Sequence, residues 1–262
     1  MAELSSDIDD FARRDLTILG QTKPVLTTGT VGPAVIIIHE VYGFTPTMAR
    51  FCRWVRDAGF RVYAPVLFGR VDARNPERVM LGRLLGLCIS REFYLFAAGK
   101  SSPVVEWLKH LARLAHGECG GPGVGVVGMC LTGNFALAMA VEPTVLAPVL
   151  AQPGLPSHLP AAIDVSSSDL AAVRGRVDNE GLLVRGYRFE GDKLCRAARF
   201  ETLGRELGAG FVGTTLPDTA ANPEGRKPPH SVFTTELIDA AGEPTRAAVD
   251  DVIGFFRERL HG

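Results

Sequence analysis

The hydrophobic positions of the chain follow two alternating patterns. Short apolar stretches are each followed by a segment in which apolar residues recur every three or four positions. The first pattern is typical of buried strands of a parallel sheet, and the second is typical of amphipathic helices. The alternation predicts an α/β fold with a mostly parallel central sheet and helices on both faces. The expected strands are 34–38, 60–65, 124–127, 145–150, 181–189 and 211–216, and the expected helices are 46–58, 103–116, 131–140, 168–173, 194–207 and 245–260.

Two segments depart from this alternation. Residues 15–31 carry apolar residues on both sides of a polar turn, which predicts an edge hairpin. Residues 71–101 are less periodic: 76–87 favours a helix, and 88–98 is rich in aromatic residues. This segment is either a lid or substrate wall, or a surface excursion whose aromatic residues pack down. No repeat or linker interrupts the chain, so we expect one domain over residues 1–262.

Composition and charge exclude several classes of function. The chain has 28 basic and 29 acidic residues and a net charge of −1, so it lacks the charge excess of proteins that bind nucleic acid or anionic membranes. The N-terminus has no signal-peptide pattern and no apolar run is long enough to span a membrane, which predicts a cytoplasmic protein. The five scattered cysteines form no Cys-x-x-Cys pair, which indicates reduced thiols and neither disulfides nor a metal site.

The segment Gly128-Met129-Cys130-Leu131-Thr132-Gly133 joins a predicted buried strand to a predicted helix through an abrupt turn with Cys130 at its tip. The N-H groups of a helix N-terminus favour negative charge, so this position suits a nucleophilic thiolate. The pattern resembles the nucleophile elbow Gly-x-nucleophile-x-Gly, with Thr132 where the second glycine is expected. The alternative is a buried structural cysteine, because free cysteines are among the most buried residues.

A cysteine nucleophile needs a base and a group that orients the base. Asp192 follows the strand 181–189, and His230 follows the last strand in a Pro-rich loop. Because the carboxyl ends of parallel strands meet at one edge of a sheet, both turns are expected to lie near Cys130. Asp192 also suits a helix N-cap, and His39, at the end of an earlier strand, is expected to be structural.

Four motifs in this order resemble the dienelactone hydrolase family, a branch of the α/β-hydrolase fold that uses cysteine. The resemblance covers nearly the whole chain. The motifs are His39-Glu40-Val41-Tyr42-Gly43, Gly128-Met129-Cys130-Leu131-Thr132-Gly133, Phe189-Glu190-Gly191-Asp192 and His230-Ser231-Val232-Phe233.

The resemblance implies a role for each matching residue. Cys130 is the nucleophile, His230 the base and Asp192 the residue that orients the base. Glu40 meets the thiol in the resting state and helps set when the thiolate forms. The oxyanion lies on the backbone N-H groups of Val41 and Leu131, and no cofactor is needed.

The chain departs from the family pattern at two positions. The family elbow usually has glycine where Thr132 stands, so the turn is either slightly wider or stabilised locally by the threonine hydroxyl. The family also binds a substrate carboxylate with arginines, one of them four residues after the histidine, where this chain has Thr234. Candidates for such an arginine within the segment 71–101 are Arg78, Arg83 and Arg91.

The sequence therefore predicts a hydrolase that cleaves a small ester or lactone, in the manner of a carboxymethylenebutenolidase, through a Cys-His-Asp triad and an acyl-thioester intermediate. One alternative is a general carboxylesterase or thioesterase acting on neutral esters. Another is a non-catalytic hydrolase-fold protein that binds a ligand or senses oxidants through its thiol. The expected partner is a small-molecule substrate, and the expected state is a monomer or small homo-oligomer.

Overall fold

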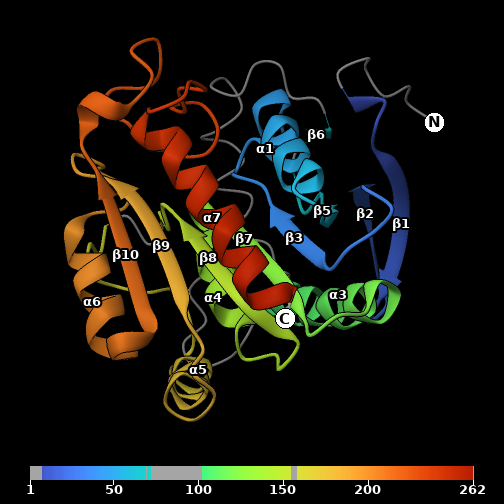
Figure 1. The fold of residues 1–262 in the computed structure, drawn as a ribbon. Helices are drawn as coiled ribbons and strands as arrows, with labels where there is room; N and C mark the ends of the chain where they lie inside the picture. Colours follow the sequence, from blue (N-terminus) through green and yellow to red (C-terminus); the bar gives the residue numbers. More distant parts are fainter. Residues whose placement is uncertain (1–7, 69, 72–101, 155–157, 262) are drawn as a thin grey trace.

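The computed structural model describes residues 8–68, 70–71, 102–154 and 158–261. Within these residues an eight-stranded sheet runs through the molecule in the order β1-β2-β5-β3-β7-β8-β9-β10 (Figure 1). Its strands are β1 (Ala12–Ile18), β2 (Gln21–Thr28), β3 (Ala34–Ile38), β5 (Arg61–Pro65), β7 (Val124–Met129), β8 (Val145–Ala151), β9 (Val184–Phe189) and β10 (Phe211–Leu216). The strands from β5 to β10 are parallel, and the pairings β1–β2 and β2–β5 are antiparallel. The mostly parallel sheet and the edge hairpin are as predicted.

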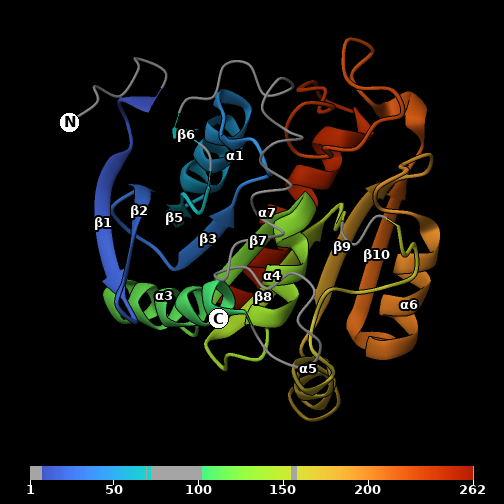
Figure 2. The ribbon, with the colours of Figure 1, turned by 180° about the vertical axis from the view of Figure 1, so that it is seen from behind.

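Helices cover both faces of the sheet, as the alternating pattern predicts. The helices are α1 (Pro46–Asp57), α3 (Pro103–Cys119), α4 (Gly133–Met139), α5 (Ser167–Glu180), α6 (Ala197–Leu207) and α7 (Pro244–Leu260). On one face, α1 and α7 pack in the same apolar cluster as Val35 and Ile37 of β3. On the other, α3, α4, α5 and α6 pack with Ile36 and Ile38 (Figures 1 and 2). Successive residues of one strand thus enter opposite cores, which explains why β3 carries no polar residue.

Several helices differ from their predicted bounds. The helix expected at 103–116 is α3, which continues to Cys119, and the helix expected at 131–140 is α4, which begins at Gly133 after a 3-10 turn. The helix expected at 168–173 is α5, which continues to Glu180 and ends at Gly181 in the left-handed conformation. The helix expected from residue 194 begins at Ala197. The three preceding residues instead turn around the Asp192 carboxylate, whose Oδ1 accepts from the N-H groups of Leu194 and Cys195 at 2.8 and 3.0 Å.

The segment 71–101 lies almost entirely outside the described residues. Arg70–Val71 forms the short strand β6, which pairs in parallel with β4 (Gly43–Phe44). The helix expected at 76–87, the question of a lid, and the candidates Arg78, Arg83 and Arg91 therefore stay predictions.

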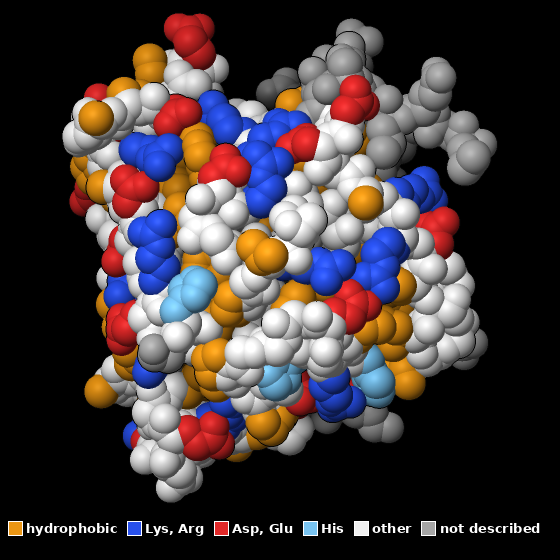
Figure 3. Space-filling view, turned by 45° about the vertical axis from the view of Figure 1, so that its right-hand side comes forward, with side chains coloured by type: hydrophobic (Ala, Val, Ile, Leu, Met, Phe, Trp, Pro, Cys, Tyr) orange, Lys and Arg blue, Asp and Glu red, His pale blue; other side chains and the backbone are white. Residues whose placement is uncertain are grey.

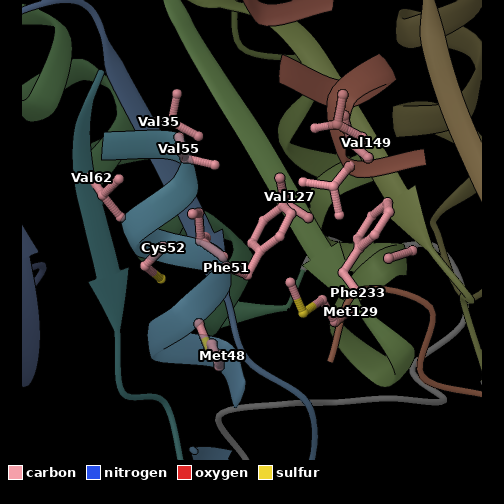
Figure 4. Packing of buried hydrophobic residues seen from close by; sticks show 14 of the residues in the cluster. Val35, Met48, Phe51, Cys52, Val55, Val62, Val127, Met129, Val149 and Phe233 are labelled. Atoms are coloured by element: carbon pink, nitrogen blue, oxygen red, sulfur yellow. The ribbon is translucent and has the colours of Figure 1, made fainter. Parts of the chain in front are cut away.

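The core also anchors the segment after His230. Phe233 stacks on Phe51 of α1 with ring centroids 5.1 Å apart, and both side chains point into the cluster around Val127 and Met129 (Figure 4). Burying a phenylalanine side chain contributes about 1.5–3 kcal/mol. The loop that carries the histidine is therefore fastened to the apolar interior three residues farther along.

Acidic and basic side chains are interspersed on the face shown in Figure 3 rather than gathered by sign. This distribution agrees with the near-zero net charge of the chain.

Among the described residues, none of the helices combines the length and apolar character required to cross a bilayer.

Candidate active site

Cys130 lies at the tip of a sharp turn between β7 and α4. Its φ is +59°, a left-handed conformation that residues with a side chain rarely adopt. A short 3-10 turn, Cys130–Thr132, leads directly into α4. A Cβ atom on Gly128 would overlap the Thr132 carbonyl oxygen, so the turn requires glycine there. This is the strained strand-turn-helix geometry of a nucleophile elbow.

Thr132 is buried and its hydroxyl holds the elbow together from inside. Oγ1 accepts from the Met129 N-H at 2.8 Å and lies 2.9 Å from the Met129 carbonyl oxygen. It also lies 3.1 and 3.2 Å from the carbonyl oxygens of Ile38 and His39, at the end of β3. Of the two alternatives raised by the missing glycine, the local hydroxyl contact is present. It ties the Cys130 turn to the strand end that carries Glu40.

His230 and Asp192 are hydrogen-bonded, with 2.7 Å between Nδ1 and Oδ2, and both side chains are buried. An ionised carboxylate only accepts, so we assign the imidazole proton to Nδ1. Nε2 is buried and makes no hydrogen bond of normal geometry within the described part of the chain. Its lone pair is therefore available to a proton from a nearby donor.

The imidazole and the thiol meet at Gly154. A Cβ built on this glycine would lie 3.2 Å from Sγ of Cys130 and 3.3 Å from Cε1 of His230. Burial by itself would lower the pKa of His230, but its interactions with the Cys130 side chain and with the Asp192 carboxylate outweigh it and raise that pKa well above its ordinary value. The arrangement thus stabilises the imidazole of His230 once it has taken up a proton.

Glu40 follows β3 directly and is buried. Its Oε1 accepts from Nε2 of Gln152 at 2.8 Å, and its Oε2 accepts from the Thr234 hydroxyl at 3.4 Å. Burial raises the pKa of Tyr42 to about 12, and the negative charges of Glu40 and Cys130 add to this effect. Glu40 and Cys130 therefore act electrostatically on the same tyrosine. No hydrogen bond joins the two within the described residues, and the resting-state contact between them stays a prediction.

Three residues that interact with Glu40, two by hydrogen bonds and one through its charge, were not predicted. Neither Gln152 nor Glu236 was a candidate residue, and Thr234 was noted only for replacing an arginine. Glu236 is buried and accepts from the N-H groups of Ser231 and Arg226 at 2.8 and 3.1 Å. Burial raises the pKa of Glu236, and the charge of Glu40 adds to this. The one sequence signal for Gln152 was its position as a polar residue at the carboxyl end of a buried strand.

His39 makes backbone contacts with both ring nitrogens. The Leu67 N-H donates to Nε2 at 3.0 Å, so Nε2 carries no proton and Nδ1 donates to the Glu40 carbonyl oxygen at 2.6 Å. The ring is completely buried. His39 is a neutral structural histidine, as the sequence predicts.

The proposed oxyanion donors belong to the same two turns. Leu131 follows Cys130 within the 3-10 turn and Val41 follows Glu40 after β3, and both residues are buried.

In the part of the chain that the structure describes, no group of three or more His, Cys, Asp or Glu side chains is arranged to hold a metal ion.

A model of the dienelactone hydrolase family matches residues 24–180. The chain belongs to the dienelactone hydrolase family. The matched region contains Glu40 and Cys130 and ends before Asp192 and His230. Members of this family are hydrolases, and the protein is accordingly a hydrolase of the dienelactone hydrolase type acting on ester bonds.

Solved structures agree with the α/β-hydrolase fold. A dienelactone hydrolase-like promiscuous phosphotriesterase from metagenomic libraries superposes with a TM-score of 0.64 at 18% identity, over 95% of this chain and 98% of that one. A dienelactone hydrolase from Anabaena variabilis gives 0.56 at 16% identity, over 96% and 99%. A Rhizomucor miehei esterase gives 0.55 at 12% identity, over 95% and 83%. At such low identity these likenesses show the fold alone. A search of curated proteins found no match.

Proposed function

We propose that this hydrolase cleaves a small ester or lactone by transferring the acyl group to Cys130. The observation that carries the proposal is the buried His230–Asp192 hydrogen bond beside a cysteine at the tip of a strained elbow. A thiol nucleophile needs a base within reach and a third group that orients the base. His230 and Asp192 suit these two roles, and the reaction requires no cofactor.

In the first half of the reaction, Nε2 of His230 takes the thiol proton and Sγ of Cys130 attacks the carbonyl carbon. A carbon–sulfur bond forms, and the carbonyl electron pair moves onto oxygen. The N-H groups of Leu131 and Val41 stabilise this oxyanion; one such donor typically lowers a barrier by about 3 kcal/mol. The oxyanion then collapses, the bond to the alcohol oxygen breaks, and the imidazolium returns its proton to the leaving oxygen.

In the second half, water removes the acyl group from the thioester. His230 takes a proton from the water, and the resulting hydroxide adds to the thioester carbonyl. The second oxyanion uses the same two N-H donors. Its collapse breaks the carbon–sulfur bond, releases the carboxylic acid and regenerates Cys130, whose proton comes back from His230.

Glu40 has a proposed role before the chemical step. We assign it the resting-state contact with the thiol that the family resemblance implies. Its burial, and the electrostatic influence that it shares with Cys130 on Tyr42, support this assignment. A carboxylate in that position helps to set when the thiolate forms.

A second candidate is a general esterase or thioesterase on neutral substrates. Thr234 favours it, because an uncharged residue stands four positions after His230 and its hydroxyl is hydrogen-bonded to Glu40. A substrate carboxylate would then need a cation from another segment, for which Arg78, Arg83 and Arg91 stay the candidates. A comparison of matched neutral and carboxylate-bearing esters separates the two specificities.

The test is time-resolved intact mass spectrometry together with product release on a panel of activated esters and unsaturated lactones. We expect wild type to turn over at least one substrate and Cys130→Ala to turn over none. Cys119→Ala is a matched control, because that thiol lies at the end of α3 and is also reduced. It should retain wild-type activity.

The proposal fails if folded wild-type protein hydrolyses none of the panel and never gains an acyl mass on Cys130. If Cys130→Ala also leaves ligand affinity unchanged, the preferred hypothesis is then a non-catalytic hydrolase-fold protein that binds a ligand or senses oxidants.

A further inference from the structure

Gln152 stands at the end of β8 and is completely buried. Its φ is +36°, which places it with Leu19 and Cys130 as the non-glycine residues in the left-handed region within the described chain. Leu19 belongs to an exposed hairpin turn, where such a conformation is common. Cys130 is the proposed nucleophile. A strained conformation at a buried site persists only where the surroundings hold it, and such positions concentrate at functional sites.

The side-chain amide of Gln152 joins two parts of the candidate site. Its Nε2 donates to Oε1 of Glu40 at 2.8 Å, and its Oε1 accepts from the N-H of Val232 at 3.3 Å. Val232 is two residues after His230 in the chain. The backbone N-H of Gln152 donates to the Tyr187 carbonyl oxygen at 2.7 Å, which fixes the amide to β9. One rigidly held side chain therefore contacts both the Glu40 carboxylate and the segment of the base.

We propose that Gln152 is a positioning residue of the hydrolase. It holds the Glu40 carboxylate and the segment that carries His230 at fixed positions relative to Cys130. The inference rests on the proposed function, since it concerns the groups to which that function assigns the chemistry. Gln152 itself touches none of the reacting atoms in the proposed mechanism. It acts through Glu40 and through the backbone that carries His230.

Neighbouring contacts support this assignment. Two residues beyond Gln152, the N-H of Gly154 donates to the Cys130 carbonyl oxygen at 3.1 Å, so the same short segment also contacts the elbow. The other donor to Glu40 is the Thr234 hydroxyl, whose 3.4 Å contact is longer than that of Gln152. Glu236 is a second buried carboxylate, and the charge of Glu40 contributes to its raised pKa. With a second buried acidic group acting on Glu40, a fixed neutral donor keeps Glu40 in one orientation.

A purely structural role makes a different prediction at the same position. Gln152→Gly relieves the left-handed backbone, so a residue that mattered only for the fold would tolerate it well. Gln152→Glu keeps an acceptor for the Val232 N-H and replaces the donor to Glu40 by a carboxylate oxygen. On our proposal both variants displace groups of the candidate site. Gln152→Gly loses the contacts with both Glu40 and Val232, and Gln152→Glu loses only the hydrogen bond to Glu40.

The experiment compares wild type, Gln152→Gly and Gln152→Glu, with Leu19→Gly as the control for strain relief far from the site. Three quantities are measured: kcat and KM on the best ester of the panel, the thermal unfolding midpoint, and the downfield NMR resonance of the His230 Nδ1 proton. We expect kcat to fall about tenfold to a hundredfold in both Gln152 variants while KM changes little. The Nδ1 resonance should shift or broaden in Gln152→Gly. Leu19→Gly should match wild type in kcat and in the resonance.

Wild-type kcat and an unchanged Nδ1 resonance in folded Gln152→Gly would overturn the proposal and leave the proposed function intact. If instead wild type hydrolyses nothing, the proposed function fails, and the resonance alone still decides whether Gln152 holds the His230 segment. Gln152→Met, which is uncharged and similar in length, replaces any variant that does not fold. Retained activity in that variant would likewise overturn the proposal.

Discussion

Asp192 uses its two carboxylate oxygens for different purposes, and one of them meets His230. Oδ2 lies 2.7 Å from Nδ1 of His230, while Oδ1 accepts from the N-H groups of Leu194 and Cys195. The backbone contacts hold the carboxylate still and direct its second oxygen at the imidazole. The two readings of Asp192 from the sequence, a backbone cap or a partner of the histidine, are therefore compatible.

Asp192→Asn should lower kcat on the order of a thousandfold with little loss of stability. The two backbone donors retain the amide oxygen, so the NH₂ group faces Nδ1 of His230. Nδ1 must then accept, the ring proton moves to Nε2, and Nε2 no longer takes a proton from the thiol. A wrong tautomer of this kind is known to be severe in serine proteases. Steady-state kinetics and thermal unfolding provide the measurement.

Asp178→Asn is the control, because Asp178 lies on the exposed surface of α5, where it pairs with Arg174 and contacts none of the described residues of the candidate site. It should keep wild-type kcat. Equal kcat for Asp192→Asn and wild type would remove Asp192 from the proposed mechanism.

His230 should make stability depend on pH in a definite direction. Its pKa in the folded protein lies above the value of about 6.5 expected for the unfolded chain, so the folded state binds the proton more tightly. The resulting stabilisation is complete below about pH 6.5 and is lost as pH rises through the raised pKa. Urea unfolding of wild type and His230→Gln, under reducing conditions from pH 6 to higher pH, tests this. The difference in unfolding free energy should shift against wild type with rising pH; a shift in its favour would contradict the assignment.

Gly154→Ala should impair catalysis without unfolding the protein. The new methyl group would lie 3.2 Å from Sγ of Cys130 and 3.3 Å from Cε1 of His230, closer than such contacts normally are. Separating the thiol from its base by a fraction of an ångström should reduce kcat about tenfold to a hundredfold. Gly154 is not among the glycines with positive φ, so alanine brings no backbone strain.

Gly175→Ala is the control for this substitution. Gly175 lies within α5, and an added Cβ there meets no atom within 4 Å. Alanine should stabilise the helix by about 0.5–1 kcal/mol and leave kcat unchanged. If Gly154→Ala and Gly175→Ala have the same kcat, the thiol and imidazole do not work together across this glycine.

Thr132→Val should destabilise the protein by about 1–3 kcal/mol, because it leaves the buried N-H of Met129 without its acceptor while preserving side-chain shape. Thr132→Ser keeps the hydroxyl and should lie within about 1 kcal/mol of wild type. Urea unfolding measures both. Equal losses in the two variants would show that the methyl group, and not the hydroxyl, supports the elbow.

The sequence by itself determined the alternation of strands and helices, the edge hairpin and the strand-turn-helix around Cys130. These features depend on residues within about ten positions of one another: apolar periodicity selects strand or helix, and Gly128 permits the sharp turn. The order of the motifs also pointed to the family. The bounds of α6 were less predictable, because the Asp192 turn competes with helix formation at Leu194 and Cys195.

Only the tertiary structure decided which polar side chains surround Glu40. Gln152 is 112 residues away from Glu40 in the chain, and Thr234 is 194 residues away. Nothing local distinguishes either residue from a solvated glutamine or threonine at the end of a strand or in a loop. Their contacts arise because β3 and β8 end at the same edge of one parallel sheet and Phe233 anchors the following loop in the core. The sequence motif indicated the position of Glu40 in the chain, and long-range packing determined that Gln152 and Thr234 are its hydrogen-bond partners.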